Sequence, residues 1–265
     1  MTASSPLVKE LTRIRNTLFY LKQLGCTGFD CTEAGLSALN QLGFPETSDP
    51  FSASGSEALK PMTSPKDRLD RIREDLENCT RCSLHQGRSC LVFGEGDPLA
   101  RLVFVGEGPG FEEDQTGRPF VGKAGQLLTQ IIGAMKLSRE KVYIANVVKC
   151  RPPENRAPAV DEIRCCLPFL HRQLMAIRPR MICTLGNVAA GALLNTQTPV
   201  SRLRGIFQEW NGIPVMPTFH PAFLLRNPEK KRDVWKDMQE IMKKLESGAE
   251  SEVRPGNDGD LKTGN

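Results

Sequence analysis

Five cysteines in the middle of the chain have the spacing of metal ligands. Cys79 and Cys82 form a C-x2-C pair, Cys150 follows an apolar run, and Cys165 and Cys166 stand 15 and 16 residues further on. A C-x2-C pair brings two thiolates to one metal centre from a single turn. The pair and two later cysteines supply four ligands for zinc or an iron–sulfur cluster, and the spacing does not distinguish these metals. Buried free thiols are the alternative.

A glycine-rich segment forms the second group. Residues 106–110 read GEGPG, acids follow at 112–114, and residues 117–125 read GRPFVGKAG. Glycines at the end of a strand let the backbone approach a ligand, and a helix that starts near Lys123 offers its N-terminus to an anion. The segment is not a P-loop, because Ala124 replaces the required Ser or Thr, and it does not match the dinucleotide pattern G-x-G-x-x-G. A tight structural loop is the alternative.

The third group is HPAFLLR, residues 220–226, which follows a predicted strand. A histidine at a strand end can donate a proton or a hydrogen bond to a developing anion, although a lone histidine is as often structural. The apolar Phe223, Leu224 and Leu225 stand where a loop should be polar, which suggests a wedge inserted into a partner. Anchoring of the next helix in the core is the alternative for these leucines.

Strand and helix patterns alternate around these groups. Apolar runs predict strands at 102–105, 142–148, 181–185 and 214–219, the last preceded by an Asn211-Gly212 hairpin turn. Helical spacing covers 125–135, 160–177, 188–194 and the chain from about Lys230. Such alternation predicts an α/β fold with a mostly parallel sheet covered on both faces. The three groups then fall at the carboxyl ends of the strands, where active sites of such sheets lie.

The two ends of the chain differ from this middle part. Leucines and an isoleucine recur every three or four residues from Leu7 to Leu24, so we expect residues 1–44 to be a helical extension that packs on its own domain or binds a protein partner. Residues 45–65 are rich in Ser and Pro, which predicts a flexible linker. We expect the catalytic domain at 66–246 and a disordered tail at 247–265.

Composition limits the class of protein. The chain has 265 residues, of which 39% are apolar and 25% charged, which excludes a collagen, a coiled coil and a wholly disordered chain. We find no apolar stretch of membrane-spanning length and no signal core, so we expect a soluble protein of the cytoplasm or nucleoid. We also expect a monomer. Residues 66–245 hold 28 basic against 20 acidic side chains, which suits a polyanion such as nucleic acid.

Together, CTRC, GEGPGFEEDQTGRPFVGKAG, NVVKCRPPENRAP and HPAFLLR resemble the family 4 uracil-DNA glycosylases, the iron–sulfur branch of their superfamily. The resemblance runs from about Cys79 to Leu245. It implies a three-layer α/β/α sandwich, a 4Fe-4S cluster and removal of uracil from single- or double-stranded DNA in base-excision repair. One related branch of the superfamily, which traps the abasic sugar covalently, carries a basic loop with a histidine shortly after the GRPFVG segment. In this sequence Lys123 runs directly into AGQLLTQII, so that loop is missing. The GEGPG motif differs from the Ala-rich first motif of family 5.

The resemblance assigns roles by position. It implies the cluster ligands Cys79, Cys82, Cys150 and Cys166, with Cys165 as a competing neighbour of the last. It implies a uracil pocket formed by Phe120, Asn146, Glu113 and Gly108. For Asn146 there is a physical reason: one carboxamide matches the adjacent donor and acceptor of uracil, and it would leave buried groups unpaired against cytosine.

The catalytic and DNA-binding roles follow in the same way. The resemblance implies that His220 stabilises the leaving uracil anion, and it places Glu107 and Gly108 where other branches carry a water-activating Asp. By side-chain type, Lys123 and Arg226 would meet phosphates, while Leu224, Leu225 or Phe223 would fill the gap left by a flipped base.

Two other classes of protein are weighed against this interpretation. A non-catalytic, metal-stabilised DNA-binding module would not need Phe120, Asn146 and His220 together. An electron carrier would have compactly spaced ligands, whereas these run from 79 to 166.

Overall fold

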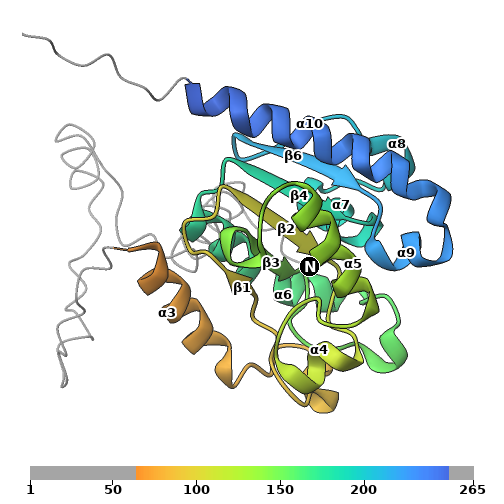
Figure 1. Cartoon of the computed structure of the whole chain (residues 1–265). Helices are drawn as coiled ribbons and strands as arrows, with labels where there is room; N and C mark the ends of the chain where they lie inside the picture. The colour runs from red at the N-terminus through yellow and green to blue at the C-terminus, as the bar shows by residue number, and fades with distance from the viewer. Residues whose placement is uncertain (1–63, 251–265) are drawn as a thin grey trace, which may run out of the picture. The chain divides into compact units, whose positions relative to one another are not determined.

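A six-stranded sheet with helices on both faces forms the centre of the molecule in the computed structural model, which describes residues 64–250 (Figure 1). The strand order is β1-β3-β2-β4-β6-β5. The four central strands β3 (Tyr143–Asn146), β2 (Leu102–Gly106), β4 (Met181–Leu185) and β6 (Ile213–Thr218) are parallel. The short edge strands β1 (Glu95–Gly96) and β5 (Gln208–Trp210) are antiparallel to their neighbours. The predicted mostly parallel sheet is confirmed.

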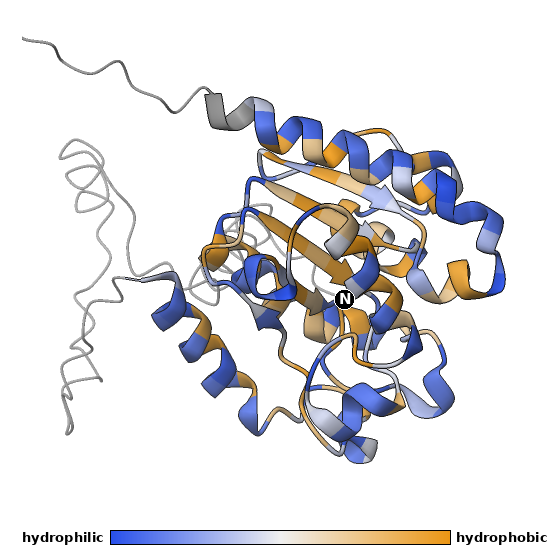
Figure 2. Cartoon of the chain, in the orientation of Figure 1, coloured by the Kyte–Doolittle hydropathy of each residue, from blue (hydrophilic) through white to orange (hydrophobic). Residues whose placement is uncertain are grey.

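Successive side chains of the central strands point to opposite faces of the sheet, and this divides the core into two layers. On β2, Val103 and Val105 pack in one apolar cluster, whereas Leu102 and Phe104 pack in the other. The first cluster is covered by α3 (Pro65–Glu77), α6 (Val160–Ile177) and α7 (Asn187–Leu194). The second is covered by α5 (Lys123–Ala134), α9 (Pro221–Arg226) and α10 (Lys231–Glu250). Figure 2 shows the apolar colour concentrated on the strands between the helices. The three-layer α/β/α sandwich is thereby confirmed.

Local signals in the sequence explain most element boundaries. Ser64 caps α3 by accepting a hydrogen bond from the amide of Asp67, and Pro65 occupies the first helical position. Asn211 and Gly212 both have positive φ, +48° and +78°, as the two-residue turn between β5 and β6 requires. Helix α3 was not predicted, because its capping sequence lies at the end of the Ser- and Pro-rich segment.

Short helices fill segments that the sequence pattern presented as loops. These are α4 (Phe111–Thr116), α8 (Val200–Leu203) and α9, together with the 3-10 turns Ser83–Gly87, Arg139–Lys141, Pro153–Asn155 and Pro228–Lys230. A loop was expected at HPAFLLR, but the structure has helix α9 there, which begins at Pro221. In this short helix the successive leucines point to different sides. Helices of this length are too short for a periodic signal.

The predicted domain limits fall partly outside the described residues. The chain divides into two units between Met62 and Thr63, and the described residues all belong to the second unit. The predicted helical extension at 1–44 and most of the linker at 45–65 lie outside the described residues, as does the tail beyond Glu250. Helix α10 reaches Glu250, so it overlaps the first residues assigned to that tail. None of the helices described is long and apolar enough to cross a lipid bilayer.

Candidate active site

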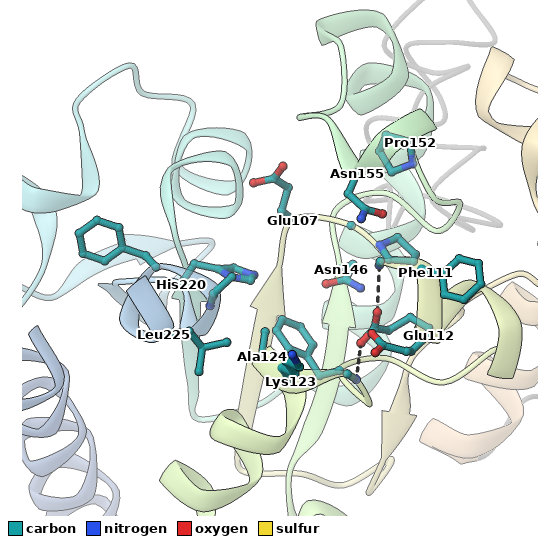
Figure 3. Close-up of a pocket in the computed structure, with 18 of the residues that line it drawn as sticks. Glu107, Phe111, Glu112, Lys123, Ala124, Asn146, Pro152, Asn155, His220 and Leu225 are labelled. Carbon is teal, nitrogen blue, oxygen red and sulfur yellow. Dashed lines mark hydrogen bonds between the residues drawn. The ribbon is translucent and has the colours of Figure 1, made fainter. Parts of the chain in front are cut away.

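A cavity of about 540 Å³ opens at the carboxyl ends of β2, β3 and β6; we call it the strand-end pocket (Figure 3). Most residues predicted for base binding, catalysis and DNA contact line it: Glu107, Gly108, Glu113, Phe120, Lys123, Asn146, His220, Leu225 and Arg226. They come from four separate parts of the chain. The parallel sheet brings them together because all of these segments follow, or pack against, the same ends of the strands.

Asn146 is the last residue of β3 and faces the pocket (Figure 3). Its side chain is 2% exposed, and its amide oxygen Oδ1 is buried without a hydrogen-bond partner. A buried acceptor without a donor costs about 1–3 kcal/mol, so such an atom calls for a ligand that donates to it. On the neighbouring strand, a Cβ at Gly106 would lie 2.4 Å from this oxygen and from the Phe120 ring. Only glycine leaves room for this arrangement.

Phe120 supplies an aromatic wall. The residue is 6% exposed and has a φ of +54°, a conformation that costs about 1–3 kcal/mol in a bulky residue unless neighbours hold it. Arg139 holds it, because its guanidinium donates to the carbonyls of Pro119 (2.7 Å) and Phe120 (2.9 Å) and is ion-paired with Glu95. The ring of Phe120 lies 5.6 Å from the ring of His220.

Glu113 joins the two loops that form the pocket floor. Its Oε2 accepts from the amide of Gly110 at 3.0 Å, and its Oε1 accepts from the amides of Val121 and Gly122, both at 2.9 Å. The side chain is buried. It is therefore a brace within the GEGPG and GRPFVG segments and not part of a solvated charge run, which was the alternative for this acidic cluster.

His220 caps the N-terminus of α9 and presents its ring to the pocket (Figure 3). Its Nδ1 accepts from the amide of Ala222 at 3.1 Å, so in the neutral ring the proton is on Nε2. Burial, followed by the positive charge of Arg226, lowers the pKa of His220 to about 4. At neutral pH the pocket thus contains a neutral imidazole that is fixed as an Nε2–H donor.

Glu107 and Gly108 continue β2 into the pocket. Burial raises the pKa of the Glu107 carboxyl above its usual range. The carbonyl of Glu107 accepts from the amide of Val148, which ties this loop to the segment after β3. A Cβ on Gly108 would come within 2.7 Å of the Val148 side chain. Glycine therefore allows the two strand ends to pack this closely.

Helix α9 separates the two leucines of HPAFLLR. Leu225 is 45% exposed at the rim of the pocket, whereas Leu224 is fully buried in the core beside α5 and α10. Leu224 was predicted to contact DNA, and that prediction is wrong, because a side chain that anchors α9 in the core cannot reach a nucleic acid. The alternative of a core anchor holds for Leu224 alone.

Two basic residues on the rim have no acidic partner among residues 64–250. Lys123 is the first residue of α5 and Arg226 the last of α9, and both line the pocket. Neither belongs to an ion pair in the described part of the chain. Their charges therefore remain available to an anionic ligand.

The cysteines line a second, small cavity, which we call the cysteine cavity. Its wall contains the sulfur-bearing residues Cys79, Cys82, Cys150, Cys165 and Cys166. Two guanidinium groups donate to sulfur, Arg88 to Cys150 at 3.4 Å and Arg81 to Cys79 at 3.6 Å. Burial raises the pKa of Cys150, and it raises that of Cys166 to about 12.

The donor atoms offered by the cysteine cavity are thiols. Within residues 64–250 no three His, Cys, Asp or Glu side chains are grouped so that they hold a metal ion directly. In a 4Fe-4S cluster each thiolate binds a different iron, so the four sulfurs lie further apart than around one zinc ion. Thiolates are also the ligands that iron–sulfur clusters require. Cys166 is buried, whereas Cys165 is half-buried, and both line the cavity.

Sequence patterns did not indicate several residues of the strand-end pocket. Arg139 braces Phe120 from 19 positions downstream, and Phe111, Pro152 and Asn155 form part of the wall. Arg139 stands on a 3-10 turn with no motif around it, so nothing local signals its role. The exposed Phe111 directly after GEGPG, and the Pro and Asn of CRPPEN, lie in quoted motifs, and their chemistry could have been considered.

Comparison with known proteins agrees with this geometry. The model of the uracil DNA glycosylase superfamily matches residues 93–241. The chain is 44% identical over 182 residues to a type-4 uracil-DNA glycosylase of Thermotoga maritima, covering 67% of this chain and 95% of that protein. It is 43% identical over 190 residues to the type-4 protein of Saccharolobus solfataricus, covering 68% and 88%. To a type-5 uracil-DNA glycosylase of Pyrobaculum aerophilum it is 29% identical over 197 residues, covering 62% and 87%.

Proposed function

The chain belongs to the uracil DNA glycosylase superfamily, and from that premise we propose that it removes uracil from DNA in base-excision repair, as a glycosylase of the type-4 kind. The observation that carries this proposal is the buried, unpartnered Oδ1 of Asn146 at the floor of the strand-end pocket. The N3–H of uracil is the donor that this oxygen lacks, and O4 of uracil accepts from the Asn146 amide nitrogen. Cytosine has an acceptor at N3 and a donor at N4, so it leaves both groups unpaired.

The base enters the pocket only after it has left the DNA stack. Phe120 then stacks against one face of the base. Arg139 holds the backbone of Phe120 at its positive φ. Leu225 fills the space that the base vacates in a duplex, and Lys123 and Arg226 bind the flanking phosphates. Glu113 fixes the two loops between which the base lies.

The reaction breaks the bond between N1 of uracil and C1′ of the sugar. The bonding pair stays with uracil, and the negative charge is shared with O2, where the Nε2–H of His220 donates a hydrogen bond. A neutral donor at this position suits the reaction, because it stabilises the anion only as the charge develops. Water adds to the cationic C1′ and loses a proton to solvent, with Glu107 and the backbone at Gly108 orienting it. The products are free uracil and an abasic site.

Cys79, Cys82, Cys150 and Cys166 are the residues that we propose to hold a 4Fe-4S cluster. They come from the segment after α3, the segment after β3, and α6. A cluster at this point joins three segments that are distant in the sequence, and it supplies structural cross-linking and no step of the hydrolysis. The amide of Lys149 hydrogen-bonds to the sulfur of Cys166, but burial has the larger effect and raises the pKa of that thiol to about 12.

The main test measures free uracil released from a uracil-containing oligonucleotide, together with the visible spectrum of the anaerobically purified protein. We expect a brown protein whose uracil release falls at least about 100-fold in His220→Ala and in Asn146→Ala. A protein that binds DNA and releases no uracil would instead support the DNA-binding module. Among single substitutions, Cys166→Ser should lose iron and Cys165→Ser should keep it; the reverse result would exchange their roles.

The wedge is tested by comparing substrates. Leu225→Ala should lower uracil release from duplex DNA more than from a single strand, because only the duplex has a stack to fill. The matched control is Leu99→Ala, another exposed leucine, which lies outside the pocket. Equal losses on both substrates would show that Leu225 does not act as a wedge.

A further inference from the structure

Phe111 is a large aromatic side chain that the proposed reaction does not use. It is 56% exposed, it belongs to neither apolar cluster, and it lines the strand-end pocket as the first residue of α4. In Figure 3 it lies on the side of the pocket opposite Leu225. Because it lines the pocket and supports no core, this phenyl ring is available to a ligand that enters there.

Arg151 lies against one face of this ring. Its guanidinium carbon is 5.1 Å from the ring centroid, and its Nε donates to Oδ1 of Asn155 at 2.7 Å. With Arg151 in this position, more than half of the Phe111 surface remains exposed. Asn155 also lines the pocket, so it fixes the guanidinium next to the pocket mouth.

The loop around Arg151 is held in an unusual conformation. Glu154 and Asn155 are consecutive residues with φ of +54° and +55°, which is uncommon outside glycine. This turn directs the Asn155 side chain toward Arg151. Strained backbone that positions exposed polar groups is typical of binding loops.

The charges of the two arginines on this loop differ. Arg156 is neutralised by Glu162, with contacts of 2.7 and 2.8 Å. Arg151 has no acidic partner within residues 64–250. The adjacent Glu112 directs its carboxylate toward Gly122, on the pocket side of α4. An exposed aromatic ring beside an unneutralised guanidinium is a combination that suits a nucleotide, with the base stacked on the ring and the phosphate on the charge.

We propose that Phe111 and Arg151 form a subsite for the nucleotide next to the uracil in the same DNA strand. This rests on the proposed function. The strand-end pocket takes one base, so the strand must leave it across the rim, and Phe111 is the exposed ring at that rim. The subsite places the strand independently of pairing, and it therefore has its greatest effect on single-stranded DNA.

The test compares Phe111→Ala with the wild type on a single-stranded oligonucleotide with one central uracil. We expect kcat/KM to fall about 10-fold, the loss expected for one base–aromatic stack, with most of the change in KM. Phe111→Trp should restore it, since stacking needs only an aromatic ring. Leu99→Ala, which removes another exposed apolar side chain away from the pocket, should change nothing.

A second set of substrates identifies the stacked base. Two oligonucleotides are used, one with an abasic nucleotide directly 5′ of the uracil and one with it directly 3′. For one of them, kcat/KM of the wild type should fall by the same factor as the Phe111→Ala substitution causes. On that oligonucleotide kcat/KM of Phe111→Ala should fall no further. Independent, multiplicative losses on both sides would overturn the proposal, as would a Phe111→Ala enzyme equal to the wild type.

Binding measurements separate this proposal from the proposed function. Affinity for the same single strand is measured by fluorescence anisotropy in the His220→Ala background over a range of salt concentrations. Arg151→Gln should reduce the slope of log affinity against log salt by about one. An unchanged slope would remove Arg151 from the subsite. If the wild type released no uracil, the proposed function would fail, and these affinities would still decide whether the subsite exists.

Discussion

The strand-end pocket and the cysteine cavity bury reactive groups in opposite ways. In the pocket the chain supplies hydrogen-bond donors to most of its buried acceptors: Glu113 accepts from three amides, and Nδ1 of His220 accepts from Ala222. One atom, Oδ1 of Asn146, is left without a partner. In the cysteine cavity, burial disfavours the thiolates of Cys150 and Cys166, and the chain supplies few donors to offset it. The pocket therefore lacks a hydrogen-bond donor for one buried oxygen, whereas the cavity lacks positive charge to offset the burial of its thiolates.

Because of this difference, substitutions in the strand-end pocket should affect activity, whereas substitutions in the cysteine cavity should affect stability. A pocket held by internal hydrogen bonds should lose catalysis without losing its fold when a residue facing the ligand is removed. A cavity whose ligands become stable only on binding metal should lose stability when one of them is removed, because metal-binding free energy is then part of the folding free energy.

The largest expected effect is on Asn146. Asn146→Ala should lower uracil release at least about 100-fold and leave the melting temperature unchanged or raised, because it removes a buried acceptor that has no partner. Thr184→Val is the matched control, since Oγ1 of Thr184 is likewise buried without a partner but lies outside the pocket. It should preserve activity. A clear fall in melting temperature for Asn146→Ala would break the comparison.

The reverse pattern is expected for the cysteines. Cys150→Ala should lose iron and brown colour, and its melting temperature should fall by about 2–4 °C for each kcal/mol lost. Cys183→Ala removes the same atoms from a buried cysteine of β4 that is not part of the cavity. It should retain iron. Full iron content in Cys150→Ala, determined by metal analysis, would contradict its role as a ligand.

The pH dependence of the free energy of unfolding tests whether His220 is buried in its neutral form. Its folded pKa of about 4 lies below the ordinary value of about 6.5, so the unfolded chain binds the proton more tightly and stability falls as pH drops from 6.5 to 4. Relative to His220→Asn, which keeps a capping side chain, the wild type should lose up to about 3 kcal/mol over this range. Denaturant unfolding at several pH values measures this difference. The raised pKa of Glu107 is common to both proteins and cancels. A difference that is independent of pH would show that the ring is not buried in its neutral form.

The smallest expected effect concerns a positioning residue. Arg139→Ala should lower kcat/KM about 10-fold, because the Phe120 backbone loses the donor that holds its positive φ. The control is Arg118→Ala, which removes the more exposed of the two arginines paired with Glu95. A surface ion pair contributes little, so we expect less than a twofold change. Equal losses in the two variants would show that Glu95, and not the carbonyl contacts, matters for the pocket.

Much of the fold was predictable from local patterns. The alternating strands and amphipathic helices defined the sandwich, and Asn211-Gly212 defined the hairpin between β5 and β6. The strand-end placement of His220 followed from the same reasoning, because parallel strands present their carboxyl ends on one side. Asn146 lay inside the predicted strand 142–148, and the structure shows that β3 ends at this residue. The short helices α4 and α9 were missed, since a single turn carries no periodic signal.

The sequence alone therefore determined the alternation of strands and helices and the edge of the sheet at which most of the motif residues gather, because periodicity and motif spacing are local properties. The roles assigned to those residues came from the family resemblance and stay predictions. Only the tertiary structure decided that Leu224 is buried while Leu225 is exposed, that Arg139 holds the Phe120 backbone, and that Oδ1 of Asn146 has no partner. Each of these depends on the direction of a side chain relative to an element distant in the sequence. Burial and hydrogen-bond satisfaction are properties of that packing, and no stretch of the sequence contains them by itself.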